Sequence, residues 1–133
     1  MVAANQRAGS KLEADKVSAP ALRTLFRIAD AWKLGAKEQM TLLGSPPRST
    51  FYKWKQGEQV VLPHDVLERI SHIFGIYSAL QVLLPKPEAA DAWIKKPNAA
   101  PLFGGRSALD RMLSGQVADL YVVRQYLDAQ RGG

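Results

Sequence analysis

The stretch that most constrains this chain covers residues 44–57, GSPPRSTFYKWKQG. It predicts a sharp turn followed by a short basic helix. Gly44 supplies the positive φ angle that a tight turn between two helices requires. Ser45 is a good N-cap, the two prolines after it fit a first helical turn, where a missing backbone N–H costs nothing, and Gly57 ends the helix.

The two sides of this predicted helix differ in chemistry. At about 100° per residue, Phe51 and Trp54 fall on one side. The other side carries only donors, a phenol and cations: Arg48, Ser49, Tyr52, Lys53 and Gln56. Such a helix can anchor one side in a core and place the other in a DNA major groove. The alternative is an ordinary corner between helices whose exposed helix is basic.

The residues before this stretch predict two further helices. Residues 18–34 have Ser18 as N-cap, Pro20 in the first turn and an apolar stripe at helical spacing. Residues 36–43 predict a short helix, which completes the order typical of a helix-turn-helix motif. We expect a DNA-binding domain over residues 19–62, preceded by a flexible tail over residues 1–18, which are poor in apolar side chains.

The second half of the chain predicts further helices. Residues 63–84 should form a long connecting helix, a candidate dimerisation surface whose apolar face can instead be wholly internal. Gly75 weakens that helix by about 1 kcal/mol relative to alanine, which allows a bend or break there. Residues 85–133 predict short helices over 88–95, after Ser107, and over 117–130. The expected fold class is therefore all-α. The apolar face of the connecting helix comprises Val66, Leu67, Ile70, Ile73, Phe74, Tyr77, Leu80 and Leu84.

Composition and spacing argue against catalysis. The chain has no cysteine, no nucleophile–base pair and no phosphate-cradling glycine loop after a strand. His64, Glu68 and His72 share one helical face but are expected to be solvated, so we predict no metal, no cofactor and no enzyme activity. No apolar run approaches a membrane span and the start lacks a signal peptide, which favours a cytoplasmic protein.

Charge is unevenly distributed along the chain. The net charge is +6. Residues 1–60 hold ten Lys and Arg against five Asp and Glu, whereas residues 61–133 hold eight against seven. A basic first half indicates a polyanionic partner there, and a nearly neutral second half indicates a different one.

The block over residues 88–115 resembles a known domain. It combines an Ala-x-x-Trp-Ile helix, Lys-Pro-Asn, and Phe-Gly-Gly-Arg-Ser-x-Leu-Asp-x-Met-Leu-Ser-Gly. This pattern resembles the C-terminal toxin-binding domain of the Xre/MbcA/ParS antitoxins, and residues 48–57 are similar to the Xre-type helix-turn-helix of the same proteins. The resemblance covers roughly residues 20–130. One departure is Pro46-Pro47, where many members have a single small or polar residue.

The resemblance implies a type II antitoxin encoded beside a RES-domain toxin, an enzyme that consumes or transfers ADP-ribose from NAD. Antitoxins of this family bind the toxin, obstruct its active-site entrance and repress their own operon. We keep two alternatives. One is a free-standing helix-turn-helix transcriptional regulator with a partner- or ligand-sensing C-terminal domain over residues 85–133. The other is a structural interaction module that does not bind DNA.

These roles give candidate residues. For the toxin, whose site normally holds an anionic dinucleotide, the last helix and tail offer Tyr121, Arg124, Gln125 and Arg131. Arg106 either holds the carbonyls of its loop, which we favour, or contacts the toxin. Helix-turn-helix proteins usually bind paired half-sites, so we expect a homodimer. The candidates for DNA binding are Arg48, Ser49, Thr50, Tyr52, Lys53 and Lys55, the last placed for a phosphate.

Overall fold

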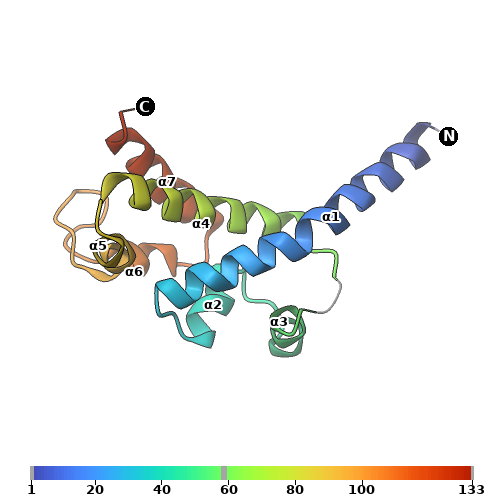
Figure 1. Cartoon of the computed structure of the whole chain (residues 1–133), viewed down its shortest axis with the longest axis horizontal. Helices are drawn as coiled ribbons and strands as arrows, with labels where there is room; N and C mark the ends of the chain where they lie inside the picture. The colour runs from blue at the N-terminus through green and yellow to red at the C-terminus, as the bar shows by residue number, and fades with distance from the viewer. Residues whose placement is uncertain (1, 58–59, 133) are drawn as a thin grey trace.

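The computed structural model describes the backbone of residues 2–57 and 60–132, with side chains described from Lys16 onward. Within these ranges there is no strand, only an isolated antiparallel bridge between Pro97 and Ser107. The all-α prediction is confirmed, and Figure 1 shows the arrangement. The helices are α1 (Val2–Ala31), α2 (Ala36–Leu42), α3 (Arg48–Lys55), α4 (His64–Leu83), α5 (Pro87–Ala92), the 3-10 turn η1 (Trp93–Lys95), α6 (Ala108–Met112) and α7 (Val117–Gln130).

Helix α4 is the central element. It packs against α1, α5 and α7 (Figure 1), and one apolar core runs through both halves of the chain. Because helices cover α4 from more than one side, its buried surface is wider than a single stripe. Ile76 and Ala79 are fully buried. Phe74, predicted to face inward, is 51% exposed, so that prediction is wrong.

Helix α1 begins much earlier than predicted. Residues 2–18, expected as a flexible tail, continue the helix, because most of them are strong helix formers such as Ala, Lys, Glu, Gln and Arg. Ser18 is therefore not an N-cap. It is fully buried, and its hydroxyl accepts a hydrogen bond from the backbone N–H of Leu62 at 3.0 Å. Pro20 lies inside the helix rather than in its first turn.

The turn between α2 and α3 also differs from the prediction. Gly44 has the expected positive φ of +89°, but Ser45 is also left-handed, at +57°, and does not cap the helix. Pro47 occupies the N-cap position and α3 begins at Arg48. The reason is that a residue preceding proline avoids the helical conformation, so a Pro-Pro pair delays the start of the helix.

Arg69 of α4 joins this turn to the second half of the chain. Its side chain is 10% exposed, and its Nε donates to a carboxylate oxygen of Asp65 at 3.1 Å. Its Nη2 donates to the carbonyl of Gly115, between α6 and α7, at 3.0 Å. A Cβ atom added at Gly44 would lie 3.1 Å from Nε of Arg69. One guanidinium therefore contacts both the helix-turn-helix turn and the turn before α7.

Helix α4 continues through Gly75, so the break that this glycine allowed does not occur. The side chain of Arg124 from α7 lies directly over this glycine. A Cβ atom added at Gly75 would lie 2.7 Å from Cζ and 2.8 Å from Cδ of Arg124. The glycine thus allows close approach of α7.

The C-terminal half follows the prediction closely. The segment between η1 and α6 is closed by hydrogen bonds from Asn98 N to Arg106 O and from Gly105 N to Asn98 O, at 3.0 and 2.9 Å. Ser107 caps α6, accepting from the Asp110 N–H at 3.1 Å. Helix α7 has the predicted bounds. In the described part of the chain, no helix is both long enough and apolar enough to span a membrane.

The Arg69 contacts predict a stability effect. Replacing Arg69 with methionine keeps an aliphatic stem but removes the hydrogen bonds to Asp65 and Gly115. We expect a loss of about 1.5–3 kcal/mol in the free energy of unfolding, the usual range for hydrogen bonds to charged groups. Urea unfolding followed by circular dichroism measures it. Arg23→Met, at an exposed position of α1, is the control. A loss no larger than that of the control would contradict this account.

Candidate functional site

Helix α3 is held in place by two buried aromatic side chains, as predicted. Phe51 is fully buried and meets the ring of Phe26 from α1 edge-on, with centroids 6.0 Å apart. Trp54, one turn later, is 6% exposed. These contacts fix the rotation of α3 about its axis, so the opposite side must face solvent.

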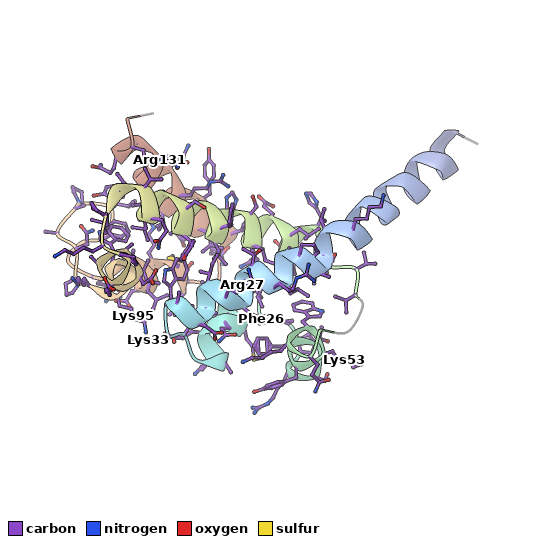
Figure 2. The ribbon with its side chains drawn as sticks, viewed as in Figure 1. Phe26, Arg27, Lys33, Lys53, Lys95 and Arg131 are labelled. Carbon is purple, nitrogen blue, oxygen red and sulfur yellow. The ribbon has the colours of Figure 1, made fainter. Side chains whose placement is uncertain are left out.

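The outer side of α3 carries donors and no carboxylate. Its exposed residues include Arg48, Ser49, Tyr52, Lys53 and Lys55, while Thr50 is half-buried. The guanidinium of Arg48 lies 5.5 Å from the centre of the Tyr52 ring, and Nζ of Lys55 lies 5.8 Å from the Phe51 ring. Figure 2 shows Lys53 on the outer side of α3. The structure thus brings all six DNA-binding candidates together on one short helix.

Lys37 lies in the same region, although it was not among the DNA-binding candidates predicted from the sequence. A surface hollow of about 410 Å³ between α2 and α3 is lined by Lys37, Thr41, Arg48 and Tyr52, among others. Lys37 is exposed in the first turn of α2, the first helix of the motif. Because that helix crosses the DNA backbone in helix-turn-helix complexes, its position in the motif could have identified it.

At the far end of the chain, Tyr121 and Gln125 form a pair on α7. Tyr121 is 47% exposed, and its hydroxyl accepts a hydrogen bond from Nε2 of Gln125 at 2.7 Å. Arg131, beyond the end of α7, is exposed and shares a hollow of about 450 Å³ with Arg124. These four candidates therefore all lie on or directly after one helix.

Arg124, a candidate toxin contact, lies against α4 instead of facing solvent freely. Its guanidinium lies over Gly75 and donates to the carbonyl of Ser71 at 3.3 Å. Its Nε lies 3.9 Å from a carboxylate oxygen of Asp128, and the side chain is 35% exposed. Arg124 therefore holds α7 against α4.

His72 is enclosed by the same contact, so the prediction that it is solvated is wrong. Its side chain is only 13% exposed. Its ring meets Tyr121 at 5.6 Å between centroids, and its Nδ1 lies 3.5 Å from Nη1 of Arg124. Docking of α7 onto α4 covers this face. Among the residues that the structure describes, no group of three or more His, Cys, Asp or Glu is arranged to hold a metal ion.

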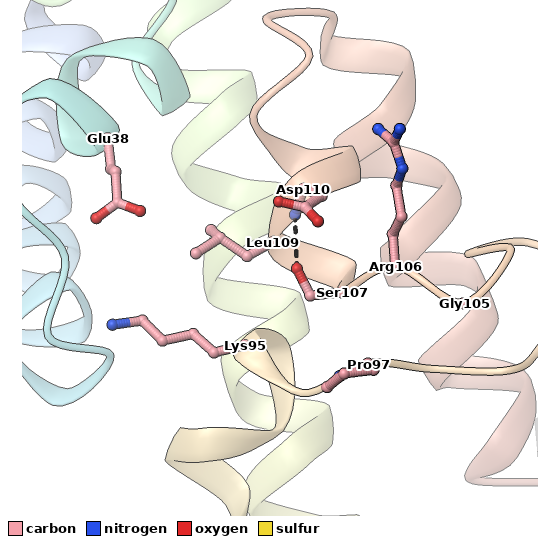
Figure 3. Close-up of a pocket in the computed structure, with 8 residues that line it drawn as sticks. All are labelled: Glu38, Lys95, Pro97, Gly105, Arg106, Ser107, Leu109 and Asp110. Atoms are coloured by element: carbon pink, nitrogen blue, oxygen red, sulfur yellow. Dashed lines mark hydrogen bonds between the residues drawn. The ribbon is translucent and has the colours of Figure 1, made fainter.

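Arg106 does not hold the carbonyls of its loop, which corrects the role we favoured. Within the described chain, its exposed side chain makes no hydrogen bond or ion pair. Arg111 of α6 holds the loop instead, donating from Nη1 to the carbonyl of Leu102 at 2.8 Å. Figure 3 shows Arg106 at a hollow of about 580 Å³ that Glu38 and Lys95 also line, apart from the α7 candidates.

Arg111 also connects this loop to α7 through Asp119. The carboxylate of Asp119 accepts from the Ser114 hydroxyl at 2.6 Å and from Nε of Arg111 at 3.0 Å. These contacts lower the pKa of Asp119 below its ordinary value. The hydrogen bond from Ser114 has the largest effect on this pKa, and the hydrogen bond and positive charge of Arg111 lower it further. The 96–106 loop, α6 and α7 are thereby tied into one unit.

Comparison with protein families agrees with this geometry. The family described as the antitoxin Xre-like helix-turn-helix domain matches residues 12–75. The family described as the antitoxin Xre/MbcA/ParS C-terminal toxin-binding domain matches residues 79–133. The chain belongs to the Xre/MbcA/ParS family of antitoxins. It is also 55% identical over 126 residues to the uncharacterized protein y4oB of Sinorhizobium fredii (strain NBRC 101917 / NGR234), covering 94% of this chain and 95% of that one.

The antitoxin thus has a helix-turn-helix half and a toxin-binding half, which meet within α4. Helix α3 lies at the lower edge of Figure 1, whereas the end of α7 lies at the upper left. The two candidate surfaces are therefore carried by different elements at different places on the molecule. The assignment of individual residues to DNA or toxin stays a prediction, as do the domain boundaries at residues 62 and 84.

The Asp119 contacts predict a pH-dependent stability. The pKa of Asp119 is lower in the folded chain than in the unfolded one, so ionised Asp119 stabilises the folded chain at pH values above the ordinary carboxyl pKa. This stabilisation is lost as the pH falls through the lowered pKa of the folded chain. We expect Asp119→Asn to reduce the free energy of unfolding at pH 7 by about 1–3 kcal/mol, with a smaller difference in acid.

Urea unfolding of both chains between pH 7 and pH 2 measures this difference. Asp30→Asn, at an exposed position of α1, provides a control with the same change in charge. If the difference in free energy of unfolding between the wild type and Asp119→Asn stays constant down to the lowest pH, the carboxylate charge is not the source of the stabilisation.

Proposed function

We propose that this antitoxin blocks a RES-domain toxin that consumes or transfers ADP-ribose from NAD, and that it represses its own operon. The observation that carries the repressor part is the basic outer face of α3, which has no carboxylate and is fixed by Phe51 and Trp54. The toxin class is supported by the resemblance of residues 88–115. The distance of α3 from the end of α7 supports two binding functions in one chain.

On the DNA side, α3 lies in the major groove. Arg48, Ser49, Thr50, Tyr52 and Lys53 reach base edges or the adjacent backbone, and Lys55 binds a phosphate. The stacking of Arg48 on Tyr52 restricts its guanidinium before binding, which lowers the entropy lost on contact with DNA. Hydrogen bonds from such donors to base edges supply sequence preference, while lysines supply salt-dependent affinity.

On the toxin side, Tyr121, Gln125 and Arg131 are the contacts we favour. A site that holds NAD accommodates an aromatic base and anionic phosphates, so an exposed phenol ring and a cation suit its entrance. Gln125 fixes the hydroxyl of Tyr121 through their hydrogen bond. Arg124 supports this surface by holding α7 on α4, and Arg106 contributes a separate contact from its loop.

The antitoxin binds DNA as a homodimer in this proposal. An apolar groove of about 270 Å³ between α1 and α4 is lined by residues including Pro20, Leu67, Ile70 and the half-exposed Phe74. A second copy of the chain is the occupant we favour, because helix-turn-helix proteins read paired half-sites through two-fold symmetry. Burial of Phe74 by the second copy removes a large apolar side chain from water.

Co-expression with the product of the adjacent reading frame tests the toxin assignment. We expect the two proteins to co-purify, and NAD loss in the cells to stop when the antitoxin is present. Tyr121→Ala combined with Arg131→Ala should restore NAD loss while the chain remains folded by circular dichroism. If the neighbouring protein neither binds this chain nor consumes NAD, the free-standing regulator becomes the better account.

Arg48→Ala combined with Lys53→Ala tests the DNA-reading surface. We expect operator binding, measured by fluorescence anisotropy, to weaken by about 2 kcal/mol or more, since a base-reading contact contributes about 1–3 kcal/mol. Neutralisation of the toxin should persist in this variant. Simultaneous loss of both functions in a folded chain would contradict the separation of the two surfaces.

Phe74→Asp tests the dimer surface. Because it places a charge in the apolar groove, we expect light scattering at micromolar concentration to report a dimer for the wild type and a monomer for the variant. Val82→Asp, at a residue 63% exposed on the same helix, serves as the control and should remain dimeric. A monomeric wild type would remove the proposal.

A further inference from the structure

A second group of cations lies where the C-terminal half meets the start of α2. Nζ of Lys95, in η1, donates to the backbone carbonyl of Lys33, in the turn after α1, at 3.0 Å. Both lysines are exposed. In Figure 2 they lie together at the lower left, on the same edge of the molecule as Lys53. Residues 62 positions apart in the chain thus contribute to one surface.

The balance of charge around this contact is positive. We call the group Lys33, Lys37, Lys95, Lys96 and Arg106 the flanking patch; all five are exposed. Two acidic residues, Glu38 and Asp110, line the same hollow as Lys95 and Arg106 (Figure 3). Glu38 already accepts a hydrogen bond from the backbone N–H of Gly35 at 3.0 Å. Lys95 and Arg106 are thus matched by Glu38 and Asp110 at the hollow, and the exposed Asp30, whose carbonyl accepts from the Lys33 N–H at 3.0 Å, adds a third carboxylate. The patch therefore has five cations beside three anions.

The flanking patch is continuous with the DNA-reading helix. Lys37 lines the hollow between α2 and α3 together with Arg48 and Tyr52. Its neighbour Glu38 lines the hollow that contains Lys95. Since the first helix of a helix-turn-helix crosses the DNA backbone, Lys37 and the lysines beside it lie on the side of the motif where a backbone passes.

We propose that Lys95 and Lys96, which belong to the toxin-binding half, bind phosphates of the operator beside α2 together with Lys33 and Lys37. This inference rests on the DNA binding proposed above. A DNA backbone suits the patch because lysines present compact point charges on flexible stems, which bind phosphates without requiring a fixed geometry. The C-terminal half then serves both partners, and the DNA footprint extends beyond that of α2 and α3.

The proposal predicts a specific salt dependence. Each phosphate contact contributes about 0.9 to the slope of log affinity against log salt concentration. Because the proposed homodimer carries each lysine twice, Lys95→Gln combined with Lys96→Gln removes four phosphate contacts and should reduce the magnitude of the slope by about 4. Between 50 and 200 mM salt, the wild type should lose roughly 100-fold more affinity than the variant. The loss should be similar on operator DNA and on an unrelated duplex, because phosphate contacts carry no sequence information.

Fluorescence anisotropy with the full-length chain tests this, using a duplex from the promoter region of its own gene and an unrelated duplex. Lys96→Gln alone isolates a lysine whose side chain makes no hydrogen bond in the described part of the chain. In the proposed homodimer it should reduce the magnitude of the slope by about 2. Lys86→Gln is the matched control, since it removes one exposed charge at the opposite end of the α5–η1 segment and should leave the slope unchanged.

The outcomes separate this inference from the function on which it rests. A wild type that fails to bind either duplex removes the DNA-binding proposal itself. A wild type that binds, with an unchanged slope in both lysine variants, overturns only the role of the flanking patch. If the variants bind DNA normally but lose the co-expressed toxin, the patch contacts the protein partner and the inference is wrong. Thermal melts by circular dichroism confirm that each variant is folded.

Discussion

The structure depends on a single buried guanidinium. Arg69 projects from α4, contacts the turn at Gly44 and donates to the carbonyl of Gly115. A buried charge is tolerated only where it is paired and its donors are satisfied, and Asp65 together with a backbone carbonyl meets that need here. Because Gly44 and Gly115 lie in different halves of the chain, the same side chain constrains the turn before α3 and the turn before α7.

The packing of α7 on α4 adds a second constraint. Gly75 leaves room for the side chain of Arg124, which in turn lies beside Ser71, His72 and Asp128. Through these contacts the toxin-binding half rests on the helix that also supports α1. The exposed pair of Tyr121 and Gln125, which we propose as toxin contacts, thus lies on a helix held against α4.

Several features followed from local sequence alone. The aromatic spacing predicted that Phe51 and Trp54 anchor α3, and both are buried. The Ser107 cap and the bounds of α7 also agree with expectation, because capping and helical periodicity are local properties. Five of the six predicted site residues on α3 are exposed for the same reason, and Thr50 is half-buried. Local pattern failed where two rules competed, as at Ser45, which is a good N-cap residue but precedes two prolines.

The helical class, the order of the elements and the polar face of α3 were predictable from the chain alone, since each depends on residues within a few positions of one another. The contacts between distant segments were not, because they form only when the helices pack. The tertiary structure placed Ser18 against Leu62, gave Arg111 the loop contact expected of Arg106, covered His72 with α7 and brought Lys95 beside Lys33. Such contacts depend on how α1 and α7 pack on α4, and helical periodicity specifies which face is buried but not which residue it meets.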